Sequence, residues 1–139
     1  IPRTQAMPMA PHAEFAVRGV PIKAVPAYNV KEERLSYHPK RNGWVGFVLT
    51  VNGVRIYHAG DTDFIPEMKD LGNIDVALLP IGGTYTMDAA EAAQAANAVA
   101  AKVTVPMHYK ALLKDKAWQA EETFQAGVRG KVELLDEVK

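Results

Sequence analysis

Apolar residues occur in short runs along the chain, and their spacing changes from one half of the sequence to the other. In the first half, apolar and polar positions alternate, as around Phe15 and Val17, which is typical of β-strands. Two further apolar runs, Trp44–Val51 and Val54–Tyr57, flank Asn52-Gly53, and both of these turn residues tolerate a positive φ. This segment therefore predicts a tight β-hairpin.

The second half alternates short apolar runs with segments of helical spacing. The pattern predicts a short helix over Pro66–Leu71, a strand over Asp75–Leu79, a helix over Ala89–Ala101, a strand over Lys102–Pro106, a helix over Asp115–Ala126 and a last strand over Val132–Leu135. Asp88 is the expected N-cap of the alanine-rich helix, whose small side chains favour close packing on a sheet. Trp118 and Phe124 are among the apolar residues of the later helix. Hairpins followed by the order β-α-β-α-β predict an α/β protein with a mixed sheet.

The chain is expected to form one domain that follows a short tail. Residues 1–12 carry three prolines and are interpreted as a tail or linker, which leaves residues 13–139 for the domain. Pro21 and Pro26 are expected to place the first hairpin at a sheet edge, because proline cannot donate a ladder hydrogen bond. Residues 28–43 are largely polar and form a loop long enough to carry function.

Composition narrows the classes of function. Sixteen Lys and Arg balance sixteen Asp and Glu, so charge gives no case for binding nucleic acid or an anionic membrane. We see no apolar run of membrane-spanning length and no secretory signal pattern. The chain has no cysteine, which fits a cytoplasmic protein and excludes thiolate ligands. A bound metal would need His, Asp or Glu ligands, a set that suits zinc, manganese or iron.

Two strand ends carry residues that can bind a metal. Asp61 follows one predicted strand and His108 follows another, and ligands of open α/β sheets gather outside the carboxyl ends of strands. Taken singly, Asp61 also fits an aspartate that caps a turn, and His108 fits a histidine satisfied near the core edge. Two ligands are fewer than the three protein ligands of a catalytic zinc.

Other histidines complete the candidate set. His38 lies in the long polar loop and is the third candidate ligand, although it also fits a solvent-exposed loop histidine. His58 is expected on the strand face opposite Tyr57, in a role that supports the ligands. His12 belongs to the predicted tail.

The loop after the strand at Asp75–Leu79 is a candidate substrate-binding segment. Gly83 and Thr84 precede a helix N-terminus, which can hold an anionic group. A plain β-to-α turn with an N-cap explains the same residues. Tyr85 and Tyr109 are candidates for orienting a substrate, or for packing against the sheet rim.

Three segments together resemble a known superfamily. Ala59-Gly60-Asp61-Thr62, then Ala77 to Met87 (ALLPIGGTYTM), then Val105-Pro106-Met107-His108-Tyr109 are similar to the metallo-β-lactamase superfamily. The resemblance is to its metal-dependent hydrolases, near the lactonases and the N-acyl-phosphatidylethanolamine phospholipases. It implies an αβ/βα sandwich of two similar halves.

The resemblance also implies roles for residues and a cofactor. Asp61 would bridge two divalent metals, most typically zinc, and His108 would be the late histidine ligand. His38 or Asn29 would take the position of the middle ligand. The implied activity is hydrolysis of an ester, lactone or phosphodiester in a small-molecule substrate, with Asp61 and His108 at the catalytic centre.

One departure from the superfamily pattern limits this expectation. The chain has no His-x-His-x-Asp-His motif, which supplies most ligands of the first metal in that superfamily. The chain is therefore interpreted as a truncated, C-terminal half of the fold that is inactive by itself and pairs with a missing N-terminal half. The alternative is a non-catalytic half-domain whose second copy forms a homodimer.

Overall fold

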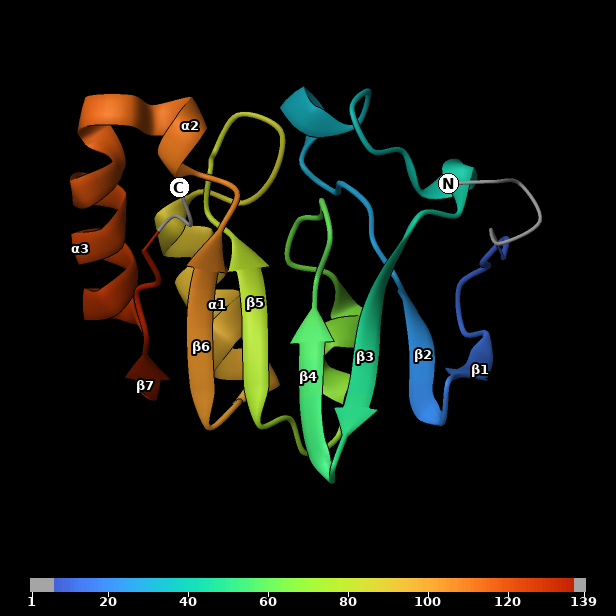
Figure 1. The fold of residues 1–139 in the computed structure, drawn as a ribbon. Coiled ribbons are helices and arrows are strands. Elements are labelled where there is room, and N and C mark those ends of the chain that lie inside the picture. Colours follow the sequence, from blue (N-terminus) through green and yellow to red (C-terminus); the bar gives the residue numbers. More distant parts are fainter. Residues whose placement is uncertain (1–6, 137–139) are drawn as a thin grey trace.

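The computed structural model describes residues 7–136, which form a mixed seven-stranded sheet with helices behind it (Figure 1). The strands are β1 (Glu14–Val17), β2 (Val20–Pro26), β3 (Val45–Val51), β4 (Val54–His58), β5 (Val76–Pro80), β6 (Val103–Met107) and β7 (Lys131–Val132). They lie in sequence order, antiparallel from β1 to β4 and parallel from β4 to β7. The expected α/β class with a mixed sheet is confirmed.

Three α-helices and several short 3-10 turns connect the strands within the described residues. The helices are α1 (Ala89–Val99), α2 (Lys110–Leu113) and α3 (Ala117–Gly127), and the turns are η2 (Glu32–Arg34), η3 (Lys40–Asn42), η4 (Pro66–Asp70) and η5 (Lys114–Lys116). No helix in this described part is long and apolar enough to span a bilayer. Part of the predicted tail, residues 1–6, lies outside the described residues, whereas the amide of His12 donates to the carbonyl of Ala24 on β2.

The pattern located most elements and misplaced some ends. Asn52 and Gly53 have φ of 49° and 81° and join β3 to β4 as predicted. The predicted helix over Asp115–Ala126 begins at Ala117. Two short elements, α2 and η5, precede the regular helix. The last strand is Lys131–Val132 rather than Val132–Leu135, since only two residues pair with β6. Of the first hairpin, β1 is the edge, and β2 pairs on both sides.

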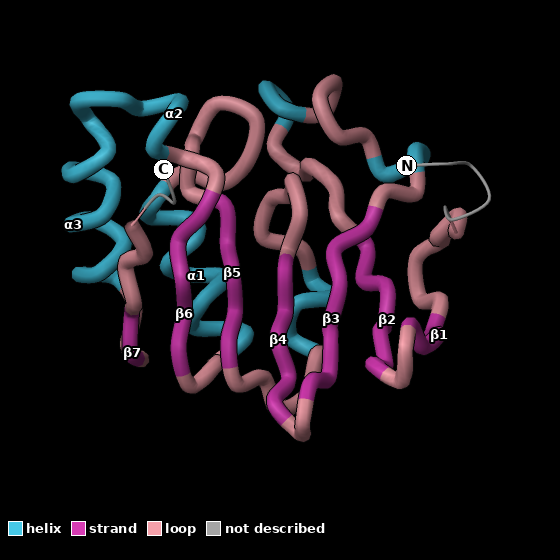
Figure 2. Tube along the Cα trace, in the orientation of Figure 1, coloured by secondary structure: helices cyan, strands magenta, loops and turns pink. Residues whose placement is uncertain are grey.

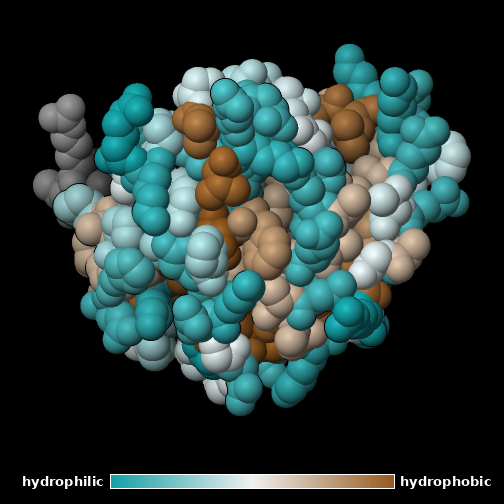
Figure 3. All heavy atoms as spheres, turned by 180° about the vertical axis from the view of Figure 1, so that it is seen from behind, coloured by the Kyte–Doolittle hydropathy of each residue, from teal (hydrophilic) through white to brown (hydrophobic). Residues whose placement is uncertain are grey.

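One face of the sheet carries the hydrophobic core. Val48, Tyr57 and Ala77 lie side by side on β3, β4 and β5 and are buried. Helix α1 packs its alanines on the β5 side of this face, as expected from its composition. A Cβ on Gly127 of α3 would stand 2.7 Å from the Cβ of Ala93, so α1 and α3 also pack closely. On this side hydrophilic residues surround a narrower hydrophobic area (Figure 3).

The opposite face is a row of apolar side chains. Ile22, Leu49, Ile56, Val76 and Val103 are neighbours in register across β2 to β6 and are half-buried. Among the described residues no helix lies over them, since α1 and η4 are behind the sheet (Figure 1). We call this row the open sheet face.

Candidate metal centre

The three predicted ligands meet at one edge of the sheet. Asp61 follows β4 and His108 follows β6, and the carboxyl ends of these parallel strands point the same way. His38 comes from the loop between β2 and β3, which lies above the same edge (Figure 2). The tertiary structure thus gathers residues that are up to 70 positions apart, from position 38 to position 108.

Both histidines direct Nε2 at the carboxylate of Asp61. His38 Nε2 is 3.5 Å from Oδ2, and His108 Nε2 is 3.9 Å from Oδ1. The side chains of Asp61 and His108 are 41% and 42% exposed, whereas that of His38 is 15% exposed, so the centre opens to solvent on the His108 side. Within residues 7–136, no group of three or more His, Cys, Asp or Glu side chains is arranged so that it could hold a metal ion. The donor types fit a divalent metal, but a complete site needs further ligands.

Asn29, the alternative to His38, does not face Asp61. Its side chain is buried, and its Oδ1 accepts hydrogen bonds from the amide and from Nδ1 of His38 at 2.9 Å and 3.0 Å. Its Nδ2 donates to Oδ1 of Asp63 at 3.1 Å and to the carbonyl of Tyr85 at 3.0 Å. The geometry therefore places His38 toward the centre and Asn29 behind it.

The side chains of the segment after β4 point in two directions, some toward the centre and others toward the loop of His38. Asp61 faces the histidines, whereas the hydroxyl of Thr62 accepts from the amide of Tyr28 at 3.1 Å. Asp63 Oδ2 accepts from the amides of Val30 and Lys31 at 2.8 Å and 3.1 Å. These bonds fasten the start of the loop to the segment that follows β4, a role of Asp63 for which the sequence pattern gives no signal.

Gly60 makes this turn possible. Its φ is +71°, a left-handed conformation, and a Cβ there would stand 3.2 Å from the carbonyl oxygen of Val45. The backbone that approaches this glycine closely is that of β3. The ring of His58, which is exposed and lies opposite the buried Tyr57 as expected, accepts from the Gly60 amide at 3.2 Å.

A buried ionic network ties the loop of His38 to α1. Arg34 lies with Nε 3.1 Å from Asp63 Oδ1, and its Nη1 and Nη2 donate to the carboxylate of Glu91 at 2.9 Å and 3.0 Å. Nη1 also donates to the carbonyl of Thr86, and Lys31 pairs with Glu91. The sequence offered no signal for this network, since Arg34 stands in a run of charged loop residues.

A second cluster fixes the other side of the same loop. The hydroxyl of Tyr28 donates to Glu67 at 3.0 Å, and Lys40 Nζ donates to that hydroxyl at 3.1 Å. Burial is the largest cause that raises the pKa of Tyr28; the hydrogen bond from Lys40 opposes the shift, and the hydrogen bond to Glu67 and the charge of Glu67 add to it. For Glu67 burial favours the protonated form, but hydrogen bonds from its own backbone, Tyr28 and Lys40 prevail and lower the pKa.

The Gly83–Asp88 segment is a β-to-α turn with an N-cap. Asp88 accepts from the amide of Glu91 at 2.8 Å, and Glu91 accepts in return from the amide of Asp88 at 2.9 Å, which forms a capping box. The N-cap prediction is confirmed, and the carboxylate of Asp88 occupies the helix N-terminus that was a candidate site for an anionic group. Gly83 is half-buried and Thr84 is exposed, so both lie near the surface beside the centre.

The two tyrosines differ in their surroundings. The ring of Tyr85 is 39% exposed and stands edge-on to Tyr37 at 4.8 Å between centroids, while its carbonyl accepts from His38 Nδ1 at 3.2 Å. Tyr109 is 4% exposed, and its hydroxyl donates to Glu121 of α3. Packing against the rim thus describes Tyr109, whereas the ring of Tyr85 is partly exposed to solvent.

The backbone of His108 is held in an unusual conformation. Its φ is +56°, which is uncommon for a residue with a side chain. The backbone of His108 also lies close to Gly82, because a Cβ on Gly82 would stand 2.5 Å from the His108 carbonyl oxygen. Gly82 therefore permits the close approach of the loops that follow β5 and β6.

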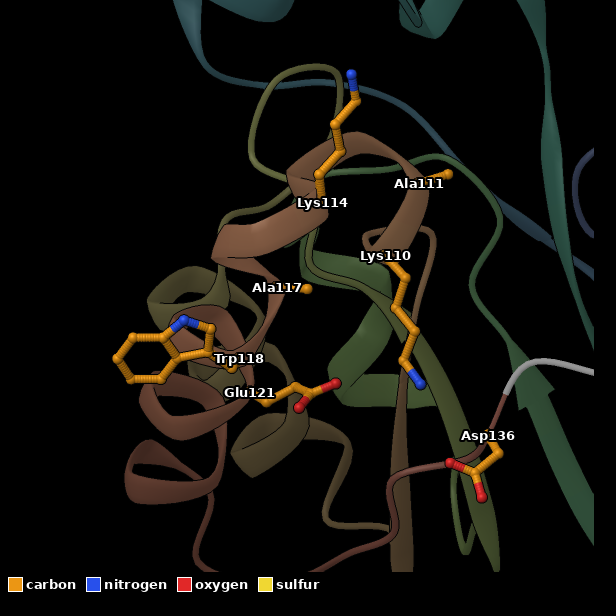
Figure 4. A pocket seen from close by; sticks show the side chains of 7 residues that line it. All are labelled: Lys110, Ala111, Lys114, Ala117, Trp118, Glu121 and Asp136. Atoms are coloured by element: carbon orange, nitrogen blue, oxygen red, sulfur yellow. The ribbon is translucent and has the colours of Figure 1, made fainter.

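Two cavities lie on the α2 side of the centre. One of about 350 Å³ adjoins His108 and is lined by apolar residues such as Met107 and Leu112. The other, of about 890 Å³, lies between α2, α3 and the last described residues (Figure 4). In it Lys110, Glu121 and Asp136 face the same space, while Trp118 points away. The larger cavity contains none of the three candidate ligands.

The comparisons with known proteins agree on one protein family. Residues 3–108 match the model of the Beta-lactamase superfamily domain. A UPF0173 metal-dependent hydrolase from Thermoplasma acidophilum is 33% identical over 140 residues, which cover 98% of this chain and 60% of the relative. The crystal structure of a protein described as a metal-dependent hydrolase from Parabacteroides distasonis aligns with a TM-score of 0.80 at 35% identity, covering 94% of this chain and 58% of that one.

A more distant structure shares the fold alone. The metallo-beta-lactamase fold protein YhfI from Bacillus subtilis aligns with a TM-score of 0.68 at 11% identity, over 94% of this chain and 53% of that chain. The chain thus spans between 53% and 60% of the length of these three proteins. Because the family model matches well over half of its residues, the chain belongs to the Beta-lactamase superfamily domain family.

Proposed function

We propose that this chain contributes His38, Asp61 and His108 as ligands to the metal centre of a hydrolase. The observation that carries the proposal is the approach of two Nε2 atoms to different oxygens of Asp61, at 3.5 Å and 3.9 Å. A carboxylate with a separate partner on each oxygen suits a position between two metal ions. The names of the Thermoplasma and Parabacteroides proteins, both metal-dependent hydrolases, support the same class.

The ligand chemistry favours zinc, with manganese or iron as alternatives. Imidazole and carboxylate donors suit all three metals, and no thiolate is present to select a softer ion. Bound divalent metals lower the pKa of water toward neutrality and polarise the oxygen of an ester, lactone or phosphodiester. The residues of this chain hold and orient the donors, and the exposed Thr84 and Tyr85 line the approach of a small-molecule substrate.

The proposal includes a second source of ligands. The chain lacks a His-x-His motif, and its three candidate donors are too few for two metals. We propose that residues 13–139 act as the C-terminal half of a sandwich whose other half supplies the remaining ligands. The open sheet face, with Leu49 and Ile56 at its middle, is the surface on which that half would pack.

Metal titration tests the assignment of the ligands. We expect zinc affinity, measured by chelator competition, to fall about 10-fold to 100-fold in Asp61→Asn and in His108→Ala. His12→Ala, which changes an exposed histidine remote from Asp61 in the sequence, is the matched control and should bind zinc as the unchanged chain does. Equal affinity in all four proteins would overturn the proposal.

The need for further ligands is tested separately. Zinc content by elemental analysis should stay at or below one ion in the isolated chain. It should rise toward two when the N-terminal part of the Thermoplasma relative is added. Two tightly bound ions in the chain alone would show that its own residues suffice.

The open sheet face also supports a second candidate, a non-catalytic homodimer. Five apolar side chains in register form a continuous strip that a second copy of the chain could cover. Light scattering after size exclusion should then give twice the mass of 15.2 kDa. Leu49→Lys should restore the monomer mass, whereas Val30→Lys, in an exposed loop position, should not. A monomer at all concentrations would exclude the dimer.

A further inference from the structure

We propose that Asn29 is a positioning residue for this centre, which holds the ring of His38 in one tautomer and directs its Nε2 at Asp61. The inference rests on the proposed function only in treating Nε2 of His38 as a metal donor. The hydrogen bonds themselves are independent of that function.

The orientation of the Asn29 amide follows from its partners. The backbone amide of His38 can only donate, so the Asn29 atom at 2.9 Å from it is the oxygen. The carbonyl of Tyr85 can only accept, so the Asn29 atom at 3.0 Å from it is the nitrogen. The reverse orientation would set donor against donor and acceptor against acceptor.

The same logic determines the tautomer of His38. Its Nδ1 lies 3.0 Å from Oδ1 of Asn29 and 3.2 Å from the carbonyl oxygen of Tyr85, and both of these oxygens accept. Nδ1 must therefore carry the proton in the neutral ring, and Nε2 then keeps its lone pair. Nε2 is the atom that lies 3.5 Å from Asp61. A ring in the other tautomer would present a proton where a metal donor is required.

Asn29 is itself held rigidly enough to select the tautomer. It is 2% exposed, and its Nδ2 is fixed by Asp63, which in turn faces Arg34. Trp44 also packs edge-on against the imidazole, at 5.5 Å between ring centroids. The ring thus contacts both the amide of Asn29 and the indole of Trp44.

Other residues at position 29 would lose part of this arrangement. Alanine removes both the acceptor for His38 and the donor to Asp63. Aspartate keeps the acceptor but places a second carboxylate at the position now 3.1 Å from Oδ1 of Asp63. The two variants therefore separate the acceptor for His38 from the donor to Asp63.

The tautomer can be observed directly without metal. Long-range ¹H–¹⁵N correlation spectra of the ¹⁵N-labelled chain, at a pH above the ordinary histidine pKa of about 6.5, report which ring nitrogen is protonated. We expect His38 to show a protonated Nδ1 in the unchanged chain. In Asn29→Ala it should shift to a mixture or to the Nε2-protonated form. His12 and His108 are internal controls in the same spectra and should not change.

A second measurement links the tautomer to the metal. Zinc affinity should fall about 10-fold to 100-fold in Asn29→Ala, at an unchanged folded fraction. It should recover partly in Asn29→Asp, which keeps the acceptor. If either variant fails to fold, the tautomer in the unchanged chain still decides, because a protonated Nε2 there overturns the proposal. The same tautomer in Asn29→Ala as in the unchanged chain also overturns it.

The outcome is distinguishable from failure of the proposed function. If His38→Ala leaves zinc affinity unchanged, His38 is no ligand and the metal centre is wrong. The tautomer experiment on the metal-free chain would still show whether Asn29 holds the ring. The two results therefore bear on separate statements.

Discussion

Arg34 Nε lies 3.1 Å from Oδ1 of Asp63, and both side chains are almost completely buried, at 4% and 2% exposure. The contact is an ion pair without the alignment of a hydrogen bond at Nε. Asp63 also accepts a hydrogen bond from Asn29, which contacts His38, and Arg34 also donates to Glu91 in the first turn of α1. The pair therefore connects the surroundings of His38 to α1. A buried charge of this kind stabilises only while its partners remain in place.

Removing one member of this pair should destabilise the fold strongly. Arg34→Met leaves Asp63 and Glu91 without their shared cation in a buried site, and we expect the free energy of unfolding to fall by about 3–5 kcal/mol. Urea denaturation measures the difference. Arg41→Met, at an exposed arginine of the same loop, should change stability by about 0.5 kcal/mol or less. Similar stability of the two variants would show that the ionic network contributes little.

Gly46 should not tolerate a side chain. A Cβ at this position would overlap the carbonyl oxygens of His58 and Ala59, just before Asp61. Gly46→Ala should cost about 1–3 kcal/mol in unfolding free energy, because the end of β4 must move. Gly130→Ala is the control, since its Cβ would meet nothing closer than 3.5 Å. If Gly46→Ala left the unfolding free energy unchanged, this close packing of β3 against the end of β4 would be contradicted.

Phe124 rather than Trp118 should anchor α3. The two residues were grouped together by their helical spacing, but Phe124 is fully buried and Trp118 is 54% exposed. Phe124→Ala should lower the unfolding free energy by about 3–5 kcal/mol. Trp118→Ala should lower it by about 0.5 kcal/mol. Chemical denaturation of both variants tests the order, and a larger effect at Trp118 would reverse the assignment of the buried side.

Asp75 should make stability depend on acid pH. The backbone amide of Arg55 and the ammonium of Lys102, each 2.7 Å away, hold the pKa of Asp75 below its ordinary value of 3.8. A pKa lower in the folded than in the unfolded chain gives stabilisation that is present above pH 3.8 and disappears as pH falls through the folded-state pKa. Asp75→Asn should therefore be less stable than the unchanged chain near neutral pH, and the gap should narrow in acid. A gap that is constant with pH would show that ionisation of Asp75 is unimportant.

The spacing of apolar residues was sufficient to predict most strands of the sheet. It was also sufficient to predict whether most elements are helices or strands. Asn52-Gly53 determines its hairpin locally, because the turn conformation depends on two adjacent residues. Asp88 and Glu91 determine the start of α1 in the same way, three residues apart. The bounds of the last strand, β7, were harder to predict, because only two residues pair with β6.

The residues of the candidate centre were likewise only partly predictable from the sequence. Asp61, His38 and His108 could be chosen from residue type and from their positions outside strands, and the resemblance to a superfamily added their roles. The choice between His38 and Asn29 could not be made, because both lie in one loop and differ only in where the loop directs them. The network of Asn29, Asp63 and Arg34 was invisible, since its members carry no spacing signal.

The sequence by itself determined the local structure: the turns, the caps, the alternation of strands and helices, and the residue types available to bind a metal. Tertiary structure decided which donors meet, because Asp61 and His108 are 47 positions apart and come together only through parallel pairing in the sheet. It also placed the amide of Asn29 against His38, where its Oδ1 accepts from the His38 backbone amide. The physical reason is that local conformation depends on neighbouring residues, whereas the direction of a side chain in a long loop depends on the buried hydrogen bonds that only the folded chain provides.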